Sequence, residues 1–504
     1  MDTKALRQKI LDLAIRGKLV PQDPNDEPAS VLLERIREQK QQMVKEGKLK
    51  KKDIKNDSVI FVGEDNLHYE KFPDGSVKCI EDEIPFELPE GWAWARLASI
   101  LSLSSGKSIK VRQLTDVGKY PVYGGNGING TYFDYNVEAN TIIIGRVGYY
   151  CGSVYKTTSK AWVTDNALIA EFKEPDFFEL DFLVEVLKYL NLGKTSVSTA
   201  QPVVSGKGIL PLIVPVPPKK EQINILKSYN QIVPIINILE NDKEEVLSLI
   251  TTTKSKILDL AIRGQLVPQD PDDEPASALL ERIRAEKEEL IKQGKIKRDK
   301  KESIIFKGED NSYYLKSGDL VESLGEWAFE ALPDSWSVCC LGELCDYGNC
   351  INVDIANIDD SAWMLDLEDI EKDTGIVLQK IRKAERNASS TKHLFHKGQV
   401  LYSKLRPYLN KVVLADEDGY CTSEILPLEF ERNILPQYAR YYLMSPAFLG
   451  YANKCSYGVK MPRLGTADGK KAIISVPPLN EQKRIVAAIE QALAQLDSIA
   501  ENLS

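Results

Sequence analysis

The sequence predicts an α+β protein: two globular mixed α/β domains separated by long antiparallel paired helices that form a coiled coil. Three observations predict this architecture. They are a near-identical internal repeat, a second repeat with a different spacing, and two unlike inserts between the repeated segments. Together they predict a pseudo-two-fold molecule in which the N- and C-terminal arms complete one copy of the repeat.

The first repeat joins residues 9–37 to residues 256–284, and only three of the 29 paired positions differ. Each copy contains KILDLAIRG, whose final glycine (Gly17 or Gly264) is expected to cap a helix at its C-terminus. A second charged helix is expected in each copy, ending at a further glycine. Weaker copies of the segments IF…GEDN and LPxxW follow in both halves of the chain.

The second repeat is VPPxxEQ, which begins at Val216 and again at Val476, and each copy is expected to open a helix. The central segment 216–300 therefore holds both repeats, whereas each terminal arm holds one. Extending the two offsets brings the chain ends to positions 244 and 248, so that only three residues of a full copy are missing. We therefore expect the two arms to lie together and to mimic the central segment.

Apolar residues in the central segment and the C-terminal arm recur at spacings of three and four, which is typical of a coiled-coil seam. Helices packed on a globular core would give a similar pattern, but the remaining faces are strongly charged. The residues expected in the helix-pair or partner interface are Ile235, Leu239, Val246, Leu249, Ile257, Leu260, Ile485, Ile489, Leu496 and Leu503.

These patterns divide the chain into five segments. Residues 1–52 form a helical arm, 53–217 a first domain, 218–300 a central helical spacer, 301–477 a second domain, and 478–504 a C-terminal helix. The basic runs from Lys48 and from Lys295 are expected to be solvated hinges.

The net charge of −9 argues against a nucleic-acid binder, which is usually basic. However, residues 376–411 contain nine Lys and Arg against one acid, Glu385. Because phosphates attract basic side chains locally, this run answers the objection, although a solvated charged face would give the same composition. The sequence therefore predicts that the second insert binds DNA.

The first insert contains a glycine-rich segment, Tyr120–Phe133, that fits the dinucleotide pattern GxGxxG. Because strand-favouring residues rather than a helix follow it, we expect the tip of a β-hairpin. A second pair of strands is expected around a glycine turn that carries Arg146, Tyr149 and Tyr150.

Sequence signs of catalysis are scarce. The chain has no GxxxxGK[ST] phosphate loop, no Asn-Pro-Pro-aromatic tetrad and no convincing nuclease core. Its three histidines lack a third metal ligand and are expected on the surface. We therefore expect neither catalytic residues nor a metal in this chain. It also has no apolar run of about 18 residues and no signal peptide, so we expect a cytoplasmic protein.

The motifs as a set resemble the specificity subunit of type I restriction–modification systems. KILDLAIRG-LVPQDP, LPxxW and VPPxxEQ carry this resemblance, together with YPVYGGNGINGTYF (from Tyr120) and LRPYLNK (from Leu405), which resemble target-recognition-domain segments. The resemblance implies that residues 53–217 and 301–477 are target-recognition domains. Each would bind one half of a split double-stranded DNA site.

The resemblance also implies partners. Two modification subunits would bind S-adenosylmethionine and methylate adenine, and restriction subunits would bind ATP and Mg, so this chain itself would hold no cofactor. No membrane is expected among its partners. The residues expected to contact DNA are Lys107, Lys110, Asn126, Asn129, Arg146, Tyr149, Lys156, Lys392, Lys404, Arg406, Tyr408, Asn410, Lys411, Lys460 and Arg463.

A helix over residues 235–263 would be about 44 Å long at 1.5 Å per residue. That length is close to one DNA turn of about 34–36 Å, so the helix could set the spacer between two half-sites. Three alternatives stay open: a specificity protein of an altered system, a coiled-coil scaffold with two protein-binding domains, and an unrecognised nuclease.

Overall fold

A computed structural model describes residues 2–47, 54, 57–172, 178–196, 202–295, 303–308, 310, 312–324, 332–386, 390–430 and 433–503. The chain divides into two compact units, unit 1 (Met1–Asp242) and unit 2 (Lys243–Ser504). Helices and strands are mixed in both, as the sequence predicts. In the part of the chain that is described, no helix is both long and apolar enough to cross a membrane.

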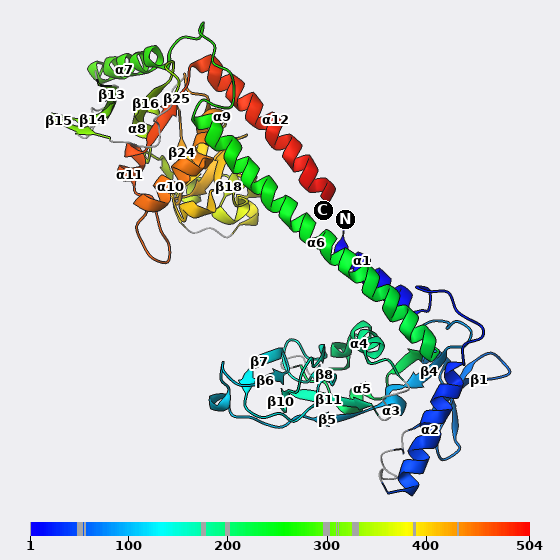
Figure 1. Ribbon diagram of the computed structural model, residues 1–504. Helices are drawn as coiled ribbons and strands as arrows, with labels where there is room; N and C mark the ends of the chain where they lie inside the picture. The colour runs from blue at the N-terminus through cyan, green and yellow to red at the C-terminus, as the bar shows by residue number, and fades with distance from the viewer. Residues whose placement is uncertain are drawn as a thin grey trace. The chain divides into compact units, whose positions relative to one another are not determined.

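One helix, α6 (Lys219–Ile262), begins in unit 1 and ends in unit 2 (Figure 1). The other elements of unit 1 are α1 (Thr3–Ile15), α2 (Ala29–Lys45), β1 (Val59–Val62), β2 (His68–Lys71), β3 (Val77–Cys79), β4 (Ala93–Arg96), α3 (Leu97–Ile100), β5 (Leu101–Ser105), β6 (Tyr120–Gly124), β7 (Gly127–Tyr132), β8 (Ile142–Gly145), β9 (Val154–Lys156), β10 (Trp162–Val163), β11 (Ala167–Phe172), α4 (Leu180–Tyr189), α5 (Gly206–Ile209) and β12 (Ile213–Val216).

Unit 2 repeats this order of elements with changes in the insert. Its elements are α7 (Ala276–Lys292), β13 (Ser303–Lys307), β14 (Tyr313–Ser317), β15 (Leu320–Ser323), β16 (Ser337–Cys340), α8 (Leu341–Leu344), β17 (Asn352–Val353), β18 (Trp363–Leu365), β19 (Ile381–Arg382), β20 (Lys392–Phe395), β21 (Val400–Ser403), β22 (Val412–Leu414), β23 (Gly419–Thr422), β24 (Ile425–Leu428), α9 (Pro436–Met444), α10 (Pro446–Cys455), α11 (Thr466–Lys471), β25 (Ile473–Val476) and α12 (Leu479–Leu503).

The repeated segments form the same frame in both units. A three-stranded antiparallel hairpin sheet, β1-β2-β3 or β13-β14-β15, follows the charged helix α2 or α7. A two-stranded pair then closes each insert, because β4 pairs with β12 and β16 pairs with β25. The expected helices and the helix openings after Val-Pro-Pro are confirmed. Most of the two basic runs expected to be hinges lies outside the described residues.

The glycine at the end of KILDLAIRG caps each first helix as expected. Gly17 and Gly264 have φ of +66° and +69°, and the next residue donates its N–H back to Leu13 or Leu260. This is the Schellman arrangement, in which a left-handed residue satisfies the last helical carbonyls. A Cβ atom at Gly264 would lie 2.5 Å from Cγ of Pro333, so the chain also needs glycine there for space.

Substituting Gly264→Ala is expected to destabilise unit 2 by about 1–3 kcal/mol, since it adds this clash to left-handed backbone strain. Gly294→Ala is the matched control. Gly294 has the same φ of +69° but no atom within 4 Å of its Cβ position, so it isolates the backbone strain. Urea unfolding of the full chain measures both. Equal losses for the two variants would show that the contact with Pro333 contributes nothing.

Three motifs that are distant in sequence meet at one point in each unit, which we call the frame junction. In unit 1, Glu221 of the VPPxxEQ motif accepts hydrogen bonds from Gln22 Nε2 (3.1 Å) and Trp92 Nε1 (2.9 Å). Burial raises the pKa of Glu221. The next residue, Gln222, bonds the Pro217 carbonyl with its amide nitrogen and receives the N–H of Glu179 at the start of α4.

Unit 2 builds its frame junction from the equivalent residues. Gln269 Nε2 donates to Glu481 Oε1 at 2.7 Å, and Gln482 bonds the Pro477 carbonyl and the Leu435 N–H. Burial raises the pKa of Glu481 as it does for its counterpart. The glutamine–glutamate bond thus forms in both units, whereas the LPxxW motif of unit 2 bonds Gln269 through Ser335 Oγ (3.1 Å) and Trp336 Nε1 has no acceptor among the described residues.

The terminal arms also pack in matching ways. Within unit 1, α1 lies along the first part of α6, where Arg7 bonds Asn237 (2.5 Å). Within unit 2, α12 lies along the last part of α6, where Lys254 pairs with Asp497 (Figure 1). The two contacts occupy equivalent repeat positions. That the two arms meet each other stays a prediction.

The residues expected in the helix-pair or partner interface differ in burial within the described chain, and their interface role stays a prediction. Ile485 and Ile489 are fully buried, and Ile257, Leu260, Leu496 and Leu503 are partly buried. In contrast, Ile235, Leu239, Val246 and Leu249 are exposed, and α6 buries Ile225, Ile236, Ile250 and Leu258 instead. The segment IVPIINIL places apolar residues on every side of α6. Its spacing therefore fits several faces, and a one-residue error turns the face by about 100°.

Candidate nucleic-acid interface

The glycine-rich segment of the first insert forms a β-hairpin, as expected. β6 and β7 pair antiparallel, with Gly124 opposite Gly127, and Gly125 and Asn126 form the tip. Gly127 has a φ of +86°, which its lack of a side chain permits. No helix opens at this loop, so a dinucleotide site of the usual kind does not form here. Asn126 and Asn129 are both exposed.

A second loop of unit 1 connects β8 to β9, and we call residues 146–153 tip loop 1. Two backbone hydrogen bonds tie it to the segment 202–204: Gly148 N–H donates to Pro202 (3.0 Å), and Arg146 accepts from Val204 (2.9 Å). Tyr149, at the turn, is 89% exposed. The loop thus presents side chains on a backbone that is held from both sides.

Unit 2 contains the same arrangement between β21 and β22, where we call residues 404–411 tip loop 2. The Arg406 N–H donates to Pro462 (2.7 Å), and Lys404 accepts from Leu464 (3.0 Å). The inserts have few residues in common, yet these bonds match those of tip loop 1.

The equivalence extends over residues 135–172 and 393–430, at a constant offset of 258. The strand pairs β8–β9 and β8–β11 have the same register as β21–β22 and β21–β24. The left-handed backbone positions coincide as well. Residues with positive φ in the first copy are Asn140, Gly148 and Gly152, and those in the second are Gly398, Arg406 and Asn410. The two inserts therefore contain one common scaffold.

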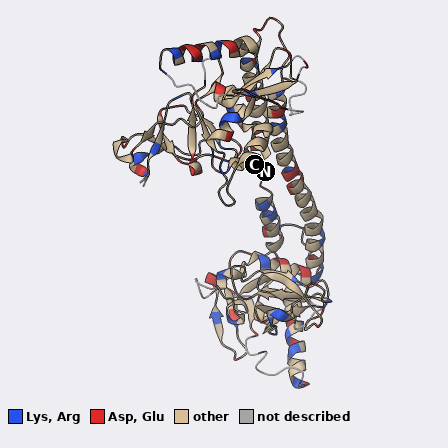
Figure 2. Cartoon of the chain, turned by 90° about the vertical axis from the view of Figure 1, so that its left-hand side faces the viewer, with Lys and Arg blue, Asp and Glu red and all other residues tan. Residues whose placement is uncertain are grey.

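The basic run of the second insert does not form a free positive surface. Lys380 and Arg382 pair with Asp416 and Glu417, both at 2.7 Å, and Lys383 pairs with Asp360 at 3.0 Å. The partners lie outside the run in sequence, so they did not enter the local charge count. Lys and Arg are accordingly interspersed with Asp and Glu over the described chain (Figure 2).

The prediction that Lys392 contacts DNA is wrong. Lys392 is 4% exposed, and its ammonium lies 3.2 Å from Asp366 in a buried cluster with Arg386 and Asp369. A strand position in the middle of the sheet β17-β20-β23-β18-β19 accounts for this burial.

Two residues of tip loop 2 have internal contacts that the sequence did not indicate. Lys411 Nζ donates to the Leu367 carbonyl at 2.7 Å, and burial lowers the pKa of this lysine. Asn410 is left-handed and donates to the Met444 carbonyl at 3.2 Å. Both side chains hold the loop in place. The sequence alone cannot distinguish a polar side chain in this structural role from one that contacts DNA.

The other residues predicted to contact DNA differ in the exposure and ion pairing of their side chains. Lys156 pairs with Asp181, and Arg463 forms an ion pair with Glu424 at 2.9 Å. Arg146, Lys404 and Arg406 are partly exposed. The predicted residues that are exposed are Lys107, Lys110, Asn126, Asn129, Tyr149, Tyr408 and Lys460. Their roles in DNA contact stay predictions.

Sequence reasoning missed the segments that brace the loops, 202–204 and 462–464, although Arg463 itself was selected for its charge. Tyr150, the counterpart of Tyr408, was noted near the turn but not selected, and it is 52% exposed. An alignment of the two inserts at the offset of 258 would have paired these tyrosines.

The histidines are not all on the surface, contrary to expectation. His393 is buried, its Nδ1 lies 2.9 Å from the Ile425 carbonyl, and burial lowers its pKa. In the described residues, no group of three or more His, Cys, Asp or Glu side chains is placed to hold a metal ion.

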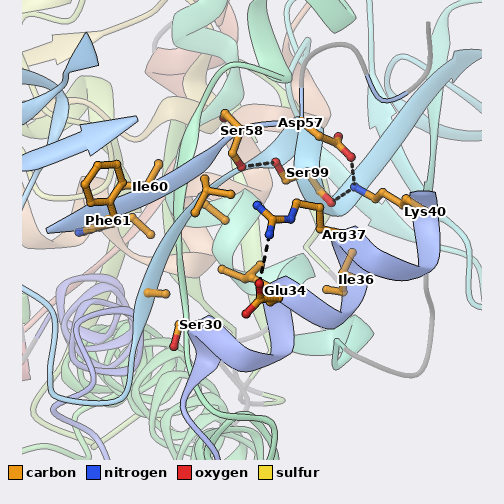
Figure 3. Close-up of a pocket in the computed structure, with 15 residues that line it drawn as sticks. Ser30, Glu34, Ile36, Arg37, Lys40, Asp57, Ser58, Ile60, Phe61 and Ser99 are labelled. Carbon is orange, nitrogen blue, oxygen red and sulfur yellow. Dashed lines mark hydrogen bonds and ion pairs between the residues drawn. The ribbon is translucent and has the colours of Figure 1, made fainter. Parts of the chain in front are cut away.

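A cavity of about 210 Å³ lies in the frame of unit 1, between α2, β1 and β4 (Figure 3). Lys40 extends from α2 to Asp57 (2.9 Å) and to the Ser99 carbonyl, and Arg37 pairs with Glu34 (3.1 Å). Lys40 thus joins α2 to two other segments of the frame, whereas the Arg37–Glu34 pair lies within α2. The cavity therefore belongs to the frame, and none of the residues that line it lies in a tip loop.

Comparison with known proteins agrees with this architecture. The family model described as "Type I restriction modification DNA specificity domain" matches residues 89–248 and 333–503, which is more than half of the chain. Each matched region begins at the proline of LPxxW and takes in one insert with its VPPxxEQ motif.

Similar proteins have the same description. The chain is 28% identical to the EcoAI specificity subunit of Escherichia coli, over 69% of this chain and 63% of that protein. It is 26% identical to the EcoEI specificity subunit of the same organism, over 99% and 90% respectively.

A solved structure from work on complex assembly and conformational transition of the type I R-M system has a TM-score of 0.50 and 15% identity. It covers 83% of this chain and 94% of its own. At that identity, the likeness supports the fold alone. With both inserts inside the matched regions, the chain belongs to the family of type I restriction–modification DNA specificity subunits.

Proposed function

We propose that this chain binds a split, asymmetric double-stranded DNA site and contacts one half with each unit. The observation that carries the proposal is the common scaffold of the two inserts, which holds different side chains at the same places. Tip loop 1 presents Arg146 and Tyr149, where tip loop 2 has Lys404 and Pro407. One backbone arrangement with two sets of side chains suits two half-sites of different sequence.

We further propose that the frame recruits two modification subunits and, through them, the restriction subunits. Ile235 and Ile238 in unit 1 and Leu249 in unit 2 are exposed apolar residues of α6, with 57%, 56% and 63% of their surface accessible. Exposed apolar residues on a long helix are typical of a protein-binding surface. This supports the partner role of Ile235, Leu239, Val246 and Leu249 that the sequence suggests.

Under this proposal the chain performs no catalysis. S-adenosylmethionine is held by the modification subunits, and ATP and Mg by the restriction subunits. The cytoplasm is the compartment in which such a complex would meet chromosomal DNA.

The test is to express the full chain with its modification subunits in a host and to map methylated adenines by single-molecule sequencing. We expect one split motif with two half-sites. Replacing residues 337–475 with the insert of another specificity subunit is then expected to change one half-site and leave the other unchanged. A change in both halves, or in neither, would contradict the assignment of one half-site to each unit.

A further inference from the structure

The strongest unexplained feature of tip loop 2 is the backbone of Arg406. It has φ of +49° and ψ of +63°, in the left-handed region that residues with a side chain rarely adopt. Its counterpart in tip loop 1 is Gly148, with φ of +95°. Glycine adopts this conformation at no steric cost, so an arginine in its place carries strain that the fold does not require.

The surrounding structure fixes this conformation. The Arg406 N–H donates to Pro462, and on either side of it Lys404 and Leu409 are held by backbone bonds. The same bond from position 148 to Pro202 forms in unit 1 without an arginine. The arginine side chain is therefore not needed to build the loop, and the backbone alone sets the direction in which it leaves the loop.

The guanidinium of Arg406 also differs from its basic neighbours. Arg382, Arg386 and Arg463 each hold a carboxylate, whereas no acid of the described chain pairs with Arg406. Its Nε is buried and has no hydrogen-bond acceptor within the described part of the chain. A buried donor without an acceptor is unfavourable. A ligand would reach this partly exposed side chain through its two terminal Nη groups.

We propose that Arg406 is a specificity-determining residue of unit 2 that donates its two forked N–H groups to the O6 and N7 atoms of a guanine. An arginine fits this pair of acceptors in the major groove better than any other side chain. Gly148 leaves the equivalent position of unit 1 without a side chain, so that unit makes no such contact there. This inference rests on the proposed function, because it names the base that one unit contacts.

The neighbouring side chains fit a nucleic-acid surface around Arg406. Tyr408 is 47% exposed in the same loop, and Lys460 is exposed on the segment that leads to Pro462. A lysine there would contact phosphate and fix the register, whereas the arginine would discriminate between bases.

The experiment uses the full chain with its modification subunits, selected against a DNA library that is randomised across both half-sites. Arg406→Gly gives position 406 the residue of its counterpart, and its melting temperature is expected to be no lower than that of the unchanged chain. We expect the preference for guanine at one base pair of one half-site to fall by about 5- to 150-fold. Arg406→Lys keeps the charge and is expected to lose most of the same preference.

Lys397→Ala is the matched control, since it removes one positive charge from an exposed position in unit 2. It should leave every base preference unchanged. If Arg406→Gly weakens binding equally for all sequences, the residue contacts a phosphate and the inference is overturned. An unchanged motif with Arg406→Gly overturns it too. If the unchanged chain selects no split motif, the proposed function itself fails.

Discussion

Replacing Arg386 with alanine is expected to lower the free energy of unfolding of unit 2 by about 3–5 kcal/mol. Arg386 Nη2 lies 2.7 Å from Asp369, which is completely buried, and its guanidinium also pairs with Asp366. Removing the arginine would leave the Asp369 carboxylate in the interior without its main counter-charge. A buried pair is costly to break because the remaining charge has no water to solvate it.

Among the described residues, Asp369 would keep only neutral donors at hydrogen-bond distance, the Gln379 amide at 3.1 Å and the Asp366 N–H at 2.8 Å. Urea denaturation of the full chain, followed by circular dichroism, measures the loss. Lys397→Ala is the control, with an expected change within about 0.5 kcal/mol because the side chain is exposed. A loss below about 1 kcal/mol for Arg386→Ala would show that the cluster is open to solvent.

Inserting a heptad into α6 between Lys243 and Ser248 is expected to lengthen the unread DNA spacer by about three base pairs. Seven helical residues add about 10.5 Å, and a base-pair step is about 3.4 Å. The insertion point lies between the α1 contact at Asn237 and the α12 contact at Lys254, so both helix pairs keep their bonds. α6 has 44 residues, or about 66 Å, which exceeds the length expected from the sequence.

Methylation mapping of the complex gives the spacer directly. Both half-site sequences should stay the same, because neither tip loop is altered. A variant in which the same heptad replaces residues 241–247 keeps the helix length and is expected to keep the spacer. An unchanged spacer with retained methylation in the insertion variant would contradict the role of α6 as a ruler.

The frame could be predicted from the sequence because its copies are nearly identical. Side chains such as Gln22 and Glu221 must recur together if they bond each other, so the repeats mark the frame junction before any coordinates are known. The expected helix ends at Gly17 and Gly264 follow from the same identity. The buried face of α6 could not be predicted, since its apolar residues surround the helix.

The common scaffold of the two inserts could not be recognised from their amino-acid sequences. Only six of the 38 paired positions are identical; in the first copy they are Tyr150, Val154, Thr164, Leu168, Glu171 and Phe172. What the copies share is strand register and backbone conformation, which different residues can satisfy. Asn140 and Gly398 are equivalent because both tolerate positive φ, not because they look alike.

The free basic residues of the second insert could not be predicted from its charge count. Lys392 is predicted from the sequence to contact DNA, and Arg386 belongs to the same basic run, but folding brings Asp366 and Asp369 against them. Net charge over a window measures a neighbourhood in sequence, whereas a phosphate responds to the neighbourhood in space. Arg406 can be distinguished from Arg382, Arg386 and Arg463 only in the folded structure, where each of those three arginines pairs with a carboxylate.

The frame junctions have a consequence for how such a protein can diversify. Every junction hydrogen bond that joins Gln22, Trp92 and Glu221 lies outside the span 93–215, and the same holds for Gln269 and Glu481 around 337–475. At each junction the glutamine accepts a main-chain N–H of the insert, which any residue except proline supplies, and in unit 2 Gln482 Nε2 also donates to the Asn433 carbonyl at 3.4 Å. An insert that replaces the residues between this tryptophan and Val-Pro-Pro would therefore join a frame junction whose side chains already bond one another. New specificities can arise by exchange of whole cassettes, without re-evolving the joint that holds them.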